Sequence, residues 1–217
     1  MAQTTQNIID SARFDLVDFV DGVGVGIEFD DVELLNYLNR MVGLMDSSLS
    51  ALQSDLVEAE ELGIDTVASQ AYVDISTLNS GLWTRIRSVW IGSTRLEQVS
   101  LNYMRYTRQF RSGDARPTIW ALWNNHILFP SGCDDAHTDL NIYYDKKTAA
   151  LILSSNMPYS DRFNEFLREM LVVCAKAKKE GIIDRADTLL SAMFRSRAMQ
   201  EEIARGFIPK PYVYWEF

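Results

Sequence analysis

Hydrophobic positions follow two different periods along this chain, and the change between them divides it into three parts. Before about residue 70, and again from about residue 160, apolar side chains recur every three or four residues, which is typical of amphipathic helices. Over residues 71–147, β-branched and aromatic residues alternate with polar ones, and turn-forming residues interrupt them every few positions. This alternation predicts short, half-buried antiparallel strands. The pattern therefore indicates a β module set between helical segments.

The N-terminal part starts with a weakly amphipathic pattern over residues 3–21, which predicts a helix. The Gly-rich run at residues 22–26 interrupts it. A phosphate-binding loop would need Gly-Lys-Ser or Gly-Lys-Thr before a helix, whereas Ile27, Glu28 and Phe29 follow here. We therefore interpret the run as a connector.

A longer helix is predicted over residues 32–61, as one helix or as two joined near residues 47 and 48. Asp30 or Asp31 can cap its N-terminus, and Gly63 is suitable as its C-cap. After residue 160, the spacing predicts two more helices, over residues 161–181 and 183–205, each followed by a glycine.

The β module is predicted in more detail. A strand around Val73 and Ile75 precedes a turn at residues 78–81, and a hairpin then turns at Gly92 and Ser93. A short helix over residues 95–106 is expected to follow. Three further strands are predicted from the segments TIWALWNN, HILFP and DLNIYYD.

Composition and charge narrow the classes of function. With 217 residues, of which 47% are hydrophobic and 24% charged, the chain can bury a core as one domain, or as one domain with a small subdomain. It has no apolar run of membrane-spanning length and no secretory signal at its start, so we expect a soluble protein made in the cytosol. The net charge of −9 disfavours general binding to phosphate backbones.

Candidate catalytic and metal-binding chemistry is sparse. The chain has two histidines, His126 and His137, and two cysteines, Cys133 and Cys174, which we expect to be reduced. The run from Cys133 to His137 contains groups that could bind zinc, but it lacks a second matched pair of ligands, so a solvated turn is the better interpretation. We predict no catalytic residue, no cofactor and no metal.

Carboxylates and tryptophans have ordinary interpretations. The acidic run at residues 58–61 and the pair at residues 30 and 31 fit solvated helix faces or caps. Four tryptophans could line a platform for a sugar or a base, although at strand spacing such residues more often pack in a core. They are Trp83, Trp90, Trp120 and Trp123.

The C-terminal tail is unusually aromatic. Two prolines hold it extended, and a tail with so much apolar surface must be buried, either on its own domain or on another subunit. Both alternatives are open. Its predicted partner-interface residues are Phe207, Ile208, Pro209, Pro211, Tyr212, Val213, Tyr214, Trp215 and Phe217.

Four short motifs follow one another along the second half of the chain. Their residues are Gly113, Arg116, Pro117 and Trp120; then Ile127, Leu128 and Pro130; then Leu140, Ile142, Tyr143 and Tyr144; and finally Pro158, Phe163, Phe166 and Leu167. In this order and spacing, the chain resembles the head–tail connector (adaptor) proteins of tailed bacteriophages over roughly residues 29 to 205. The long acidic helix expected up to Glu61 and the aromatic tail depart from the family pattern.

The resemblance implies a virion structural protein without enzymatic activity. It implies partners: a portal protein ring, a tail or nozzle protein, and other copies of the chain in a ring of about a dozen subunits. It places the protein at the head–tail junction of the virion, after synthesis in the bacterial host cytoplasm, with genomic DNA passing through the ring without specific binding and no contact with a membrane. The alternative is a small sugar- or ligand-binding module, or a hydrolase, that uses the Trp-rich sheet.

We therefore expect an α+β fold, mainly an α-helical bundle with an inserted small antiparallel β module and an extended C-terminal tail. The expected organisation is an N-terminal helix and Gly-rich connector over residues 1–26, and an adaptor domain over residues 27–206 with its β module at about 71–147. Residues 207–217 form the tail.

Overall fold

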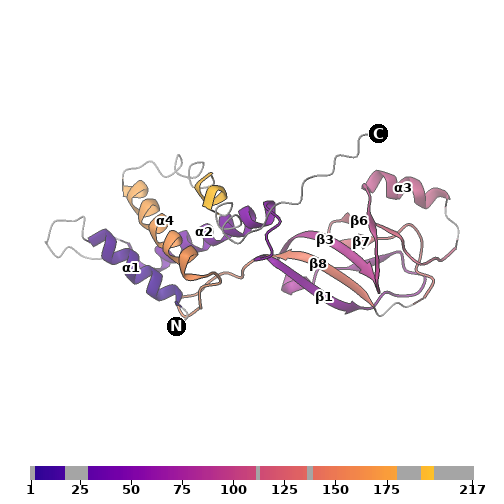
Figure 1. The fold of residues 1–217 in the computed structure, drawn as a ribbon, viewed down its shortest axis with the longest axis horizontal. Coiled ribbons are helices and arrows are strands. Elements are labelled where there is room, and N and C mark those ends of the chain that lie inside the picture. Colours follow the sequence, from indigo (N-terminus) through magenta and orange to yellow (C-terminus); the bar gives the residue numbers. More distant parts are fainter. Residues whose placement is uncertain (1–2, 18–28, 111–112, 136–138, 180–191, 198–217) are drawn as a thin grey trace. The chain divides into compact units, whose positions relative to one another are not determined.

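A computed structural model describes residues 3–17, 29–110, 113–135, 139–179 and 192–197 (Figure 1). The chain divides into two compact units. The helical unit consists of Met1–Ser54 and Thr148–Phe217, and the sheet unit consists of Asp55–Lys147. The sheet unit is therefore a single long insertion in the sequence of the helical unit.

The helical unit is built from three main helices, α1 (Thr5–Val17), α2 (Asp31–Ala51) and α4 (Asp161–Lys179), and residues 192–197 are also helical. Helix α1 packs beside both α2 and α4. Each helix buries one apolar stripe, as the spacing of three and four residues predicts. The buried side chains include Ile8, Ile9, Ala12, Leu34, Leu38, Met41, Met45, Leu49, Phe163, Leu167, Leu171 and Phe194.

Both ends of α2 follow from local chemistry. Asp30 is its N-cap, as predicted, and accepts a hydrogen bond from the backbone N–H of Glu33 at 2.6 Å. The helix ends at Ala51, well before the predicted end, because Gln53 adopts a left-handed backbone with φ of 57°. The N–H of Ser54 then returns to the carbonyl of Leu49.

The sheet unit contains two four-stranded sheets. The first has the order β1 (Glu58–Ile64), β8 (Leu140–Lys146), β3 (Trp83–Ile91) and β4 (Thr94–Arg95), and all its pairs are antiparallel. Strand β8 lies at its centre, so the last strand of the unit is paired on both sides with strands from the first half.

The second sheet has the order β2 (Tyr72–Asp74), β7 (His126–Leu128), β6 (Ile119–Trp123) and β5 (Glu97–Gln98). Its β5–β6 pair is parallel, and the other pairs are antiparallel. The short 3₁₀ segment η1 (Leu78–Gly81) occupies the predicted turn.

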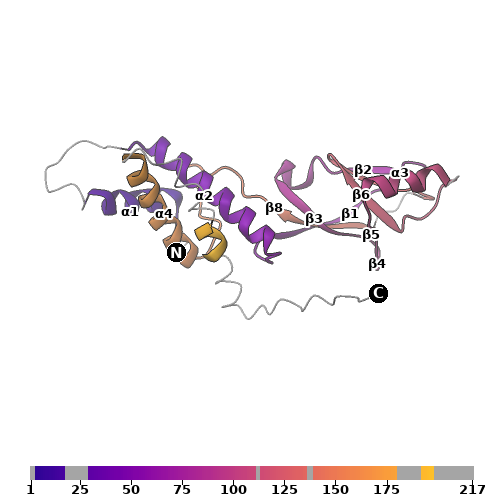
Figure 2. The ribbon, with the colours of Figure 1, turned by 90° about the horizontal axis from the view of Figure 1, so that it is seen from above.

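One hydrophobic core joins the two sheets. It contains Ile86, Val89, Ile91, Leu140, Ile142 and Tyr144 from the first sheet, and Val73, Trp120 and Ile127 from the second. Helix α3 (Leu101–Phe110) covers the other face of the second sheet, where Met104 packs against Ala121 and Leu128 (Figure 2). The sheet unit is thus a three-layer arrangement of sheet, sheet and helix.

The predicted fold class is wrong in its balance. The fold is α+β, but it is not a mainly helical bundle with a small β module, because two sheets form a substantial unit that starts at Asp55. The acidic run at residues 58–61, expected on a helix, lies in strand β1 and pairs with β8. Gly63, expected as a helix C-cap, lies in the same strand with φ of 67°.

Other element predictions are confirmed. The hairpin at Gly92 and the strands β6, β7 and β8 lie where the alternation placed them. The helix expected at residues 95–106 starts later, at Leu101, after the short strands β4 and β5. The predictions for the connector at residues 22–26, for most of the helix at residues 183–205 and for the aromatic tail at residues 207–217 lie outside the described residues.

Candidate functional site

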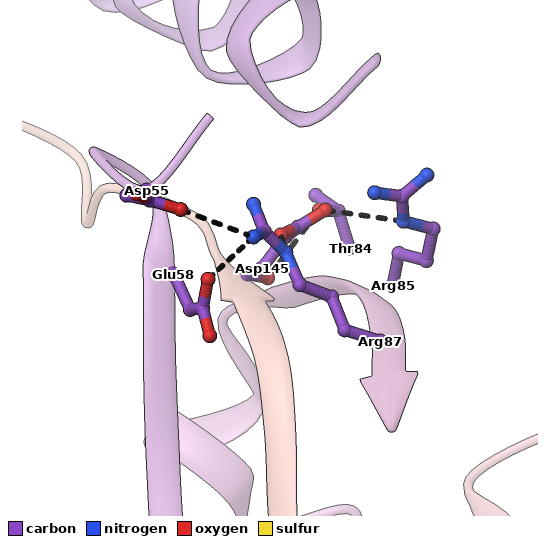
Figure 3. Close-up of polar contacts among 6 residues, drawn as sticks. All are labelled: Asp55, Glu58, Thr84, Arg85, Arg87 and Asp145. Carbon is purple, nitrogen blue, oxygen red and sulfur yellow. Dashed lines mark hydrogen bonds and ion pairs between the residues drawn. The ribbon is translucent and has the colours of Figure 1, made fainter. Parts of the chain in front are cut away.

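A charged cluster of the sheet unit surrounds Asp145, whose side chain is completely buried on β8 (Figure 3). Arg87 on β3 forms an ion pair with it through Nε, and Arg85 Nε lies 3.2 Å from its other carboxylate oxygen. Arg87 also binds Glu58 on β1 and lies 3.8 Å from Asp55. We call these five residues the Asp145 cluster.

Strand irregularities place the two arginines. The register of β3 against β8 shifts between Trp83 and Arg85, and again between Ile86 and Ser88. Such bulges re-aim side chains. Here both bulges lie next to the arginines, and the guanidinium groups of Arg85 and Arg87 both point toward the buried carboxylate of Asp145.

The Asp145 cluster is better suited to holding strands together than to catalysis. A buried carboxylate is costly unless it is paired, and two guanidinium groups neutralise this one. A general base needs a free lone pair facing a substrate, whereas both oxygens of Asp145 already bind arginine. The cluster clamps β1, β3 and β8 together where the chain enters and leaves the sheet unit.

A pocket of about 310 Å³ lies in the same unit, and Arg87 of the Asp145 cluster is one of the residues that line it. Its lining is mostly polar and charged: Arg87, Ser88, Arg95, Leu96, Glu97, Gln98 and Trp120. Small-molecule sites are usually lined mainly by apolar groups with a few placed polar ones. Ser88 is the only side chain of this lining that could act as a nucleophile, and its hydroxyl accepts a hydrogen bond from the indole N–H of Trp90 at 3.0 Å.

The predicted metal-capable residues are separated in the structure. His126 lies on β7, where its ring packs edge-on against Tyr72 with centroids 5.2 Å apart. Cys133 is a buried free thiol, and burial raises its pKa. His137 lies outside the described residues, among which no group of three His, Cys, Asp or Glu side chains could hold a metal. Cys174, in α4, is also buried and forms no disulfide.

The four tryptophans differ in how deeply they are buried. Trp120 is buried in the core and Trp83 packs against its margin, whereas Trp123 is 48% exposed at the end of β6. Trp90 is partly buried on β3. The interpretation of tryptophans as core residues holds for Trp120.

The helical unit has a buried polar centre of its own, around Asp46 on α2, which is 3% exposed. Its carboxylate accepts hydrogen bonds from the backbone N–H of Thr148 at 2.7 Å, from the Thr148 hydroxyl at 3.1 Å and from the phenol of Tyr159. Burial, followed by the negative charge of Asp46, raises the pKa of Tyr159 well above its ordinary value. This Asp46 network fixes the chain where it re-enters the helical unit.

Two turns earlier on α2, Asn39 continues the same attachment. Its side-chain amide donates to the carbonyl of Leu151 at 3.1 Å and accepts from the N–H of Leu151 at 2.6 Å. Asn39 therefore binds the backbone of Leu151 as a neighbouring strand would.

Exposed large apolar side chains occur in both units. In the helical unit these are Phe14, Val32, Ile152, Val173 and Met193, and in the sheet unit Leu62, Val67, Tyr72, Tyr103, Tyr106 and Trp123. Solvent exposure of single apolar residues is common, but several on neighbouring positions of one element indicate a contact surface. Tyr103 and Tyr106, one turn apart on α3, satisfy this condition.

Comparisons with known proteins give no family. No protein-family model matches the chain, and no curated protein matches it. No helix among the described residues is long and apolar enough to cross a membrane.

The residues that carry the resemblance to connector proteins are mostly core residues. Trp120, Ile127, Leu140, Phe163 and Leu167, for example, are almost completely buried. Buried positions of this kind report on folding rather than on a binding surface.

Sequence reasoning missed the Asp145 cluster and the Asp46 network. One signal was present for the first: Arg85 and Arg87 stand two residues apart on a strand expected to be half buried, in an acidic chain. Arginines so placed need carboxylate partners. The partners, Glu58 and Asp145, are far away in sequence, so the pattern alone could not identify them.

Proposed function

We propose that this chain is a structural protein of a tailed-bacteriophage virion, a head–tail connector that assembles as a ring of about a dozen copies on the portal. The sequence resemblance suggests this function. The structural observation that supports it is the pair of exposed tyrosines one turn apart on α3, Tyr103 and Tyr106. Covering apolar surface of this kind with a partner lowers the free energy of the assembly. In a monomer the same surface would stay exposed to water without a stabilising role.

The polar centres of the chain also fit a structural role better than an enzymatic one. The Asp145 cluster and the Asp46 network have their buried carboxylates already bound by donors within the fold. An active site would instead present a perturbed acid or base to a cavity. In this proposal each cluster keeps its own unit rigid under the load of an assembled particle.

The aromatic tail is proposed to dock on a neighbouring subunit or on the portal. Aromatic anchors dominate the binding energy of interfaces, and this tail concentrates seven large apolar residues within Phe207 to Phe217. The acidic charge of the chain suits a channel through which DNA must move, since a lumen that bound phosphates would slow its passage.

Light scattering on the full chain, with and without the portal protein encoded in the same genome, tests this function. We expect the mass of the portal complex to rise by a fixed number of copies, about a dozen. A chain ending at Gly206 separates the roles: loss of portal binding supports a docking tail, and retained binding means that the tail packs on its own protomer. If neither chain binds the portal, the proposal is wrong.

A further inference from the structure

Two oppositely charged surfaces lie on the sheet unit. The first is the exposed side of α3, where Tyr103 is 54% and Tyr106 61% exposed and Arg105 is also exposed. Residues 101–110 contain two arginines and no acidic residue, although the whole chain has a net charge of −9. We call Tyr103, Arg105 and Tyr106 the α3 face.

The α3 face is held firmly. Met104 anchors the helix in its own small core, and Arg108 binds the carbonyls of Phe129 and Ala71, each at 2.9 Å. These contacts fix the direction in which the opposite side of the helix presents its tyrosines and Arg105. The surface is therefore preorganised, which lowers the entropic cost of binding.

The second surface is the outer side of β1, the edge strand of the first sheet. Glu60, Glu61 and Leu62 are exposed on β1, and Asp65 and Val67 are exposed in the segment directly after it; Leu62 is 57% and Val67 56% exposed. We call these five residues the acidic edge. Residues 58–65 contain no basic residue. An edge strand with exposed apolar side chains tends to be covered by another element, and charges on it select which one.

We propose that the α3 face of one copy docks on the acidic edge of a second copy. Each surface combines two exposed apolar side chains with charge, and the charges are opposite, so the two complement each other better than either complements itself. Because they are different surfaces of the same unit, the contact is head-to-tail. An open row of copies therefore has an uncovered α3 face at one end and an uncovered acidic edge at the other. Such a contact closes into a ring or continues as a filament. The inference deepens the proposed function and rests on it.

Charge reversal tests the contact on the full chain. Sedimentation at low salt should show association of the wild-type chain that weakens as salt rises. R105E and E60R/E61R should each weaken association by about tenfold or more, since each places like charges opposite one another. R105E/E60R/E61R in one chain should regain most of the association. R195E, the same charge change at an exposed arginine of the helical unit, is the matched control and should leave it unchanged.

The outcomes separate this contact from the proposed function. If R105E has no effect on self-association or on the number of copies per portal, the contact is wrong even where the chain binds the portal. If the R105E/E60R/E61R variant does not regain self-association, α3 binds something other than the acidic edge. Nucleic acid then becomes the candidate ligand of α3. If the contact behaves as expected but no portal binding occurs, the connector function is wrong and the contact stands. A wild-type chain that remains monomeric both alone and with the portal overturns both.

Discussion

Among the residues that the structure describes, each unit buries one carboxylate, but the two carboxylates are stabilised by different means. Asp46 of the helical unit accepts hydrogen bonds from a backbone N–H and two hydroxyl groups, whereas Asp145 of the sheet unit is paired with two arginines. In the helical unit, the segment that follows the sheet unit brings the backbone N–H of Thr148 and the phenol of Tyr159 to Asp46 on α2. The interior of a sheet has its backbone donors already used by neighbouring strands, so a charge buried there needs side-chain cations.

The same contrast predicts which unit is the more sensitive to one substitution. Losing a partner from a buried ion pair leaves an uncompensated charge, which costs more than losing a hydrogen bond. The two units can be followed separately, because Trp83, Trp90, Trp120 and Trp123 all belong to the sheet unit. Replacing Trp215 by Phe would make tryptophan fluorescence a probe of the sheet unit alone, while far-UV circular dichroism follows the helices.

The largest effect is expected for D145N. Without the carboxylate charge, Arg87 and Arg85 lose their buried counter-ion, and the free energy of unfolding of the sheet unit should fall by about 3 kcal/mol. Urea denaturation followed by tryptophan fluorescence measures it. D55N is the matched control, because Asp55 lies 3.8 Å from Arg87 with its side chain 74% exposed. Its effect should stay within about 0.5 kcal/mol. If D145N and D55N lower the free energy of unfolding equally, burial of the Asp145 carboxylate does not determine how much its ion pairs stabilise the sheet unit.

A smaller effect is expected for D46A. The Thr148 N–H and the Tyr159 hydroxyl lose their acceptor, so the helical unit should lose about 2 kcal/mol of stability. Circular dichroism during urea denaturation measures the change, with D10N on the exposed side of α1 as the control. A loss that equals or exceeds that of D145N would contradict the ranking of ion pair above hydrogen bonds.

The smallest effect concerns pH. The pKa of Tyr159 is raised in the folded state, so the unfolded chain releases this proton first as pH increases. The contribution of the protonated Tyr159 to the free energy of unfolding is fully present below about pH 10, the ordinary tyrosine pKa. Above that pH the free energy of unfolding should fall by at most about 1.4 kcal/mol per pH unit. Y159F should show a shallower decline than the wild-type chain in denaturation series from pH 8 to pH 11. Identical slopes would mean that Tyr159 does not titrate differently in the two states.

The elements that sequence analysis found are those with local causes. Asp30 caps α2 because its side chain reaches the N–H of Glu33, three residues away. Over Leu140–Tyr144 of β8, fully buried residues alternate with less buried ones because one face of the strand packs in the core.

Strand β1 was missed for a physical reason. Of its residues, Ala59 and Ile64 reach the core margin, and four others are exposed. Its acidic composition therefore resembles a solvated helix, while its strand conformation comes from pairing with β8, more than 70 residues later. The Asp145 cluster has the same origin, because a pairing of distant strands brings its members together.

The ends of the sheet unit are tied to each other within that unit. Lys146 N–H binds the carbonyl of Val57 at 2.8 Å, and Glu58 pairs with Asp145. While the sheet unit is folded, an excursion of roughly 90 residues thus acts on the helical unit as a very short loop. If the sheet unit unfolds, α2 and the segment after Thr148 must be held together across a flexible chain of that length. The loop-closure entropy of such a chain is about 4 kcal/mol. The two halves of the molecule are thus cooperative through chain connectivity alone, and folding of the insertion prepares the framework that surrounds it in sequence.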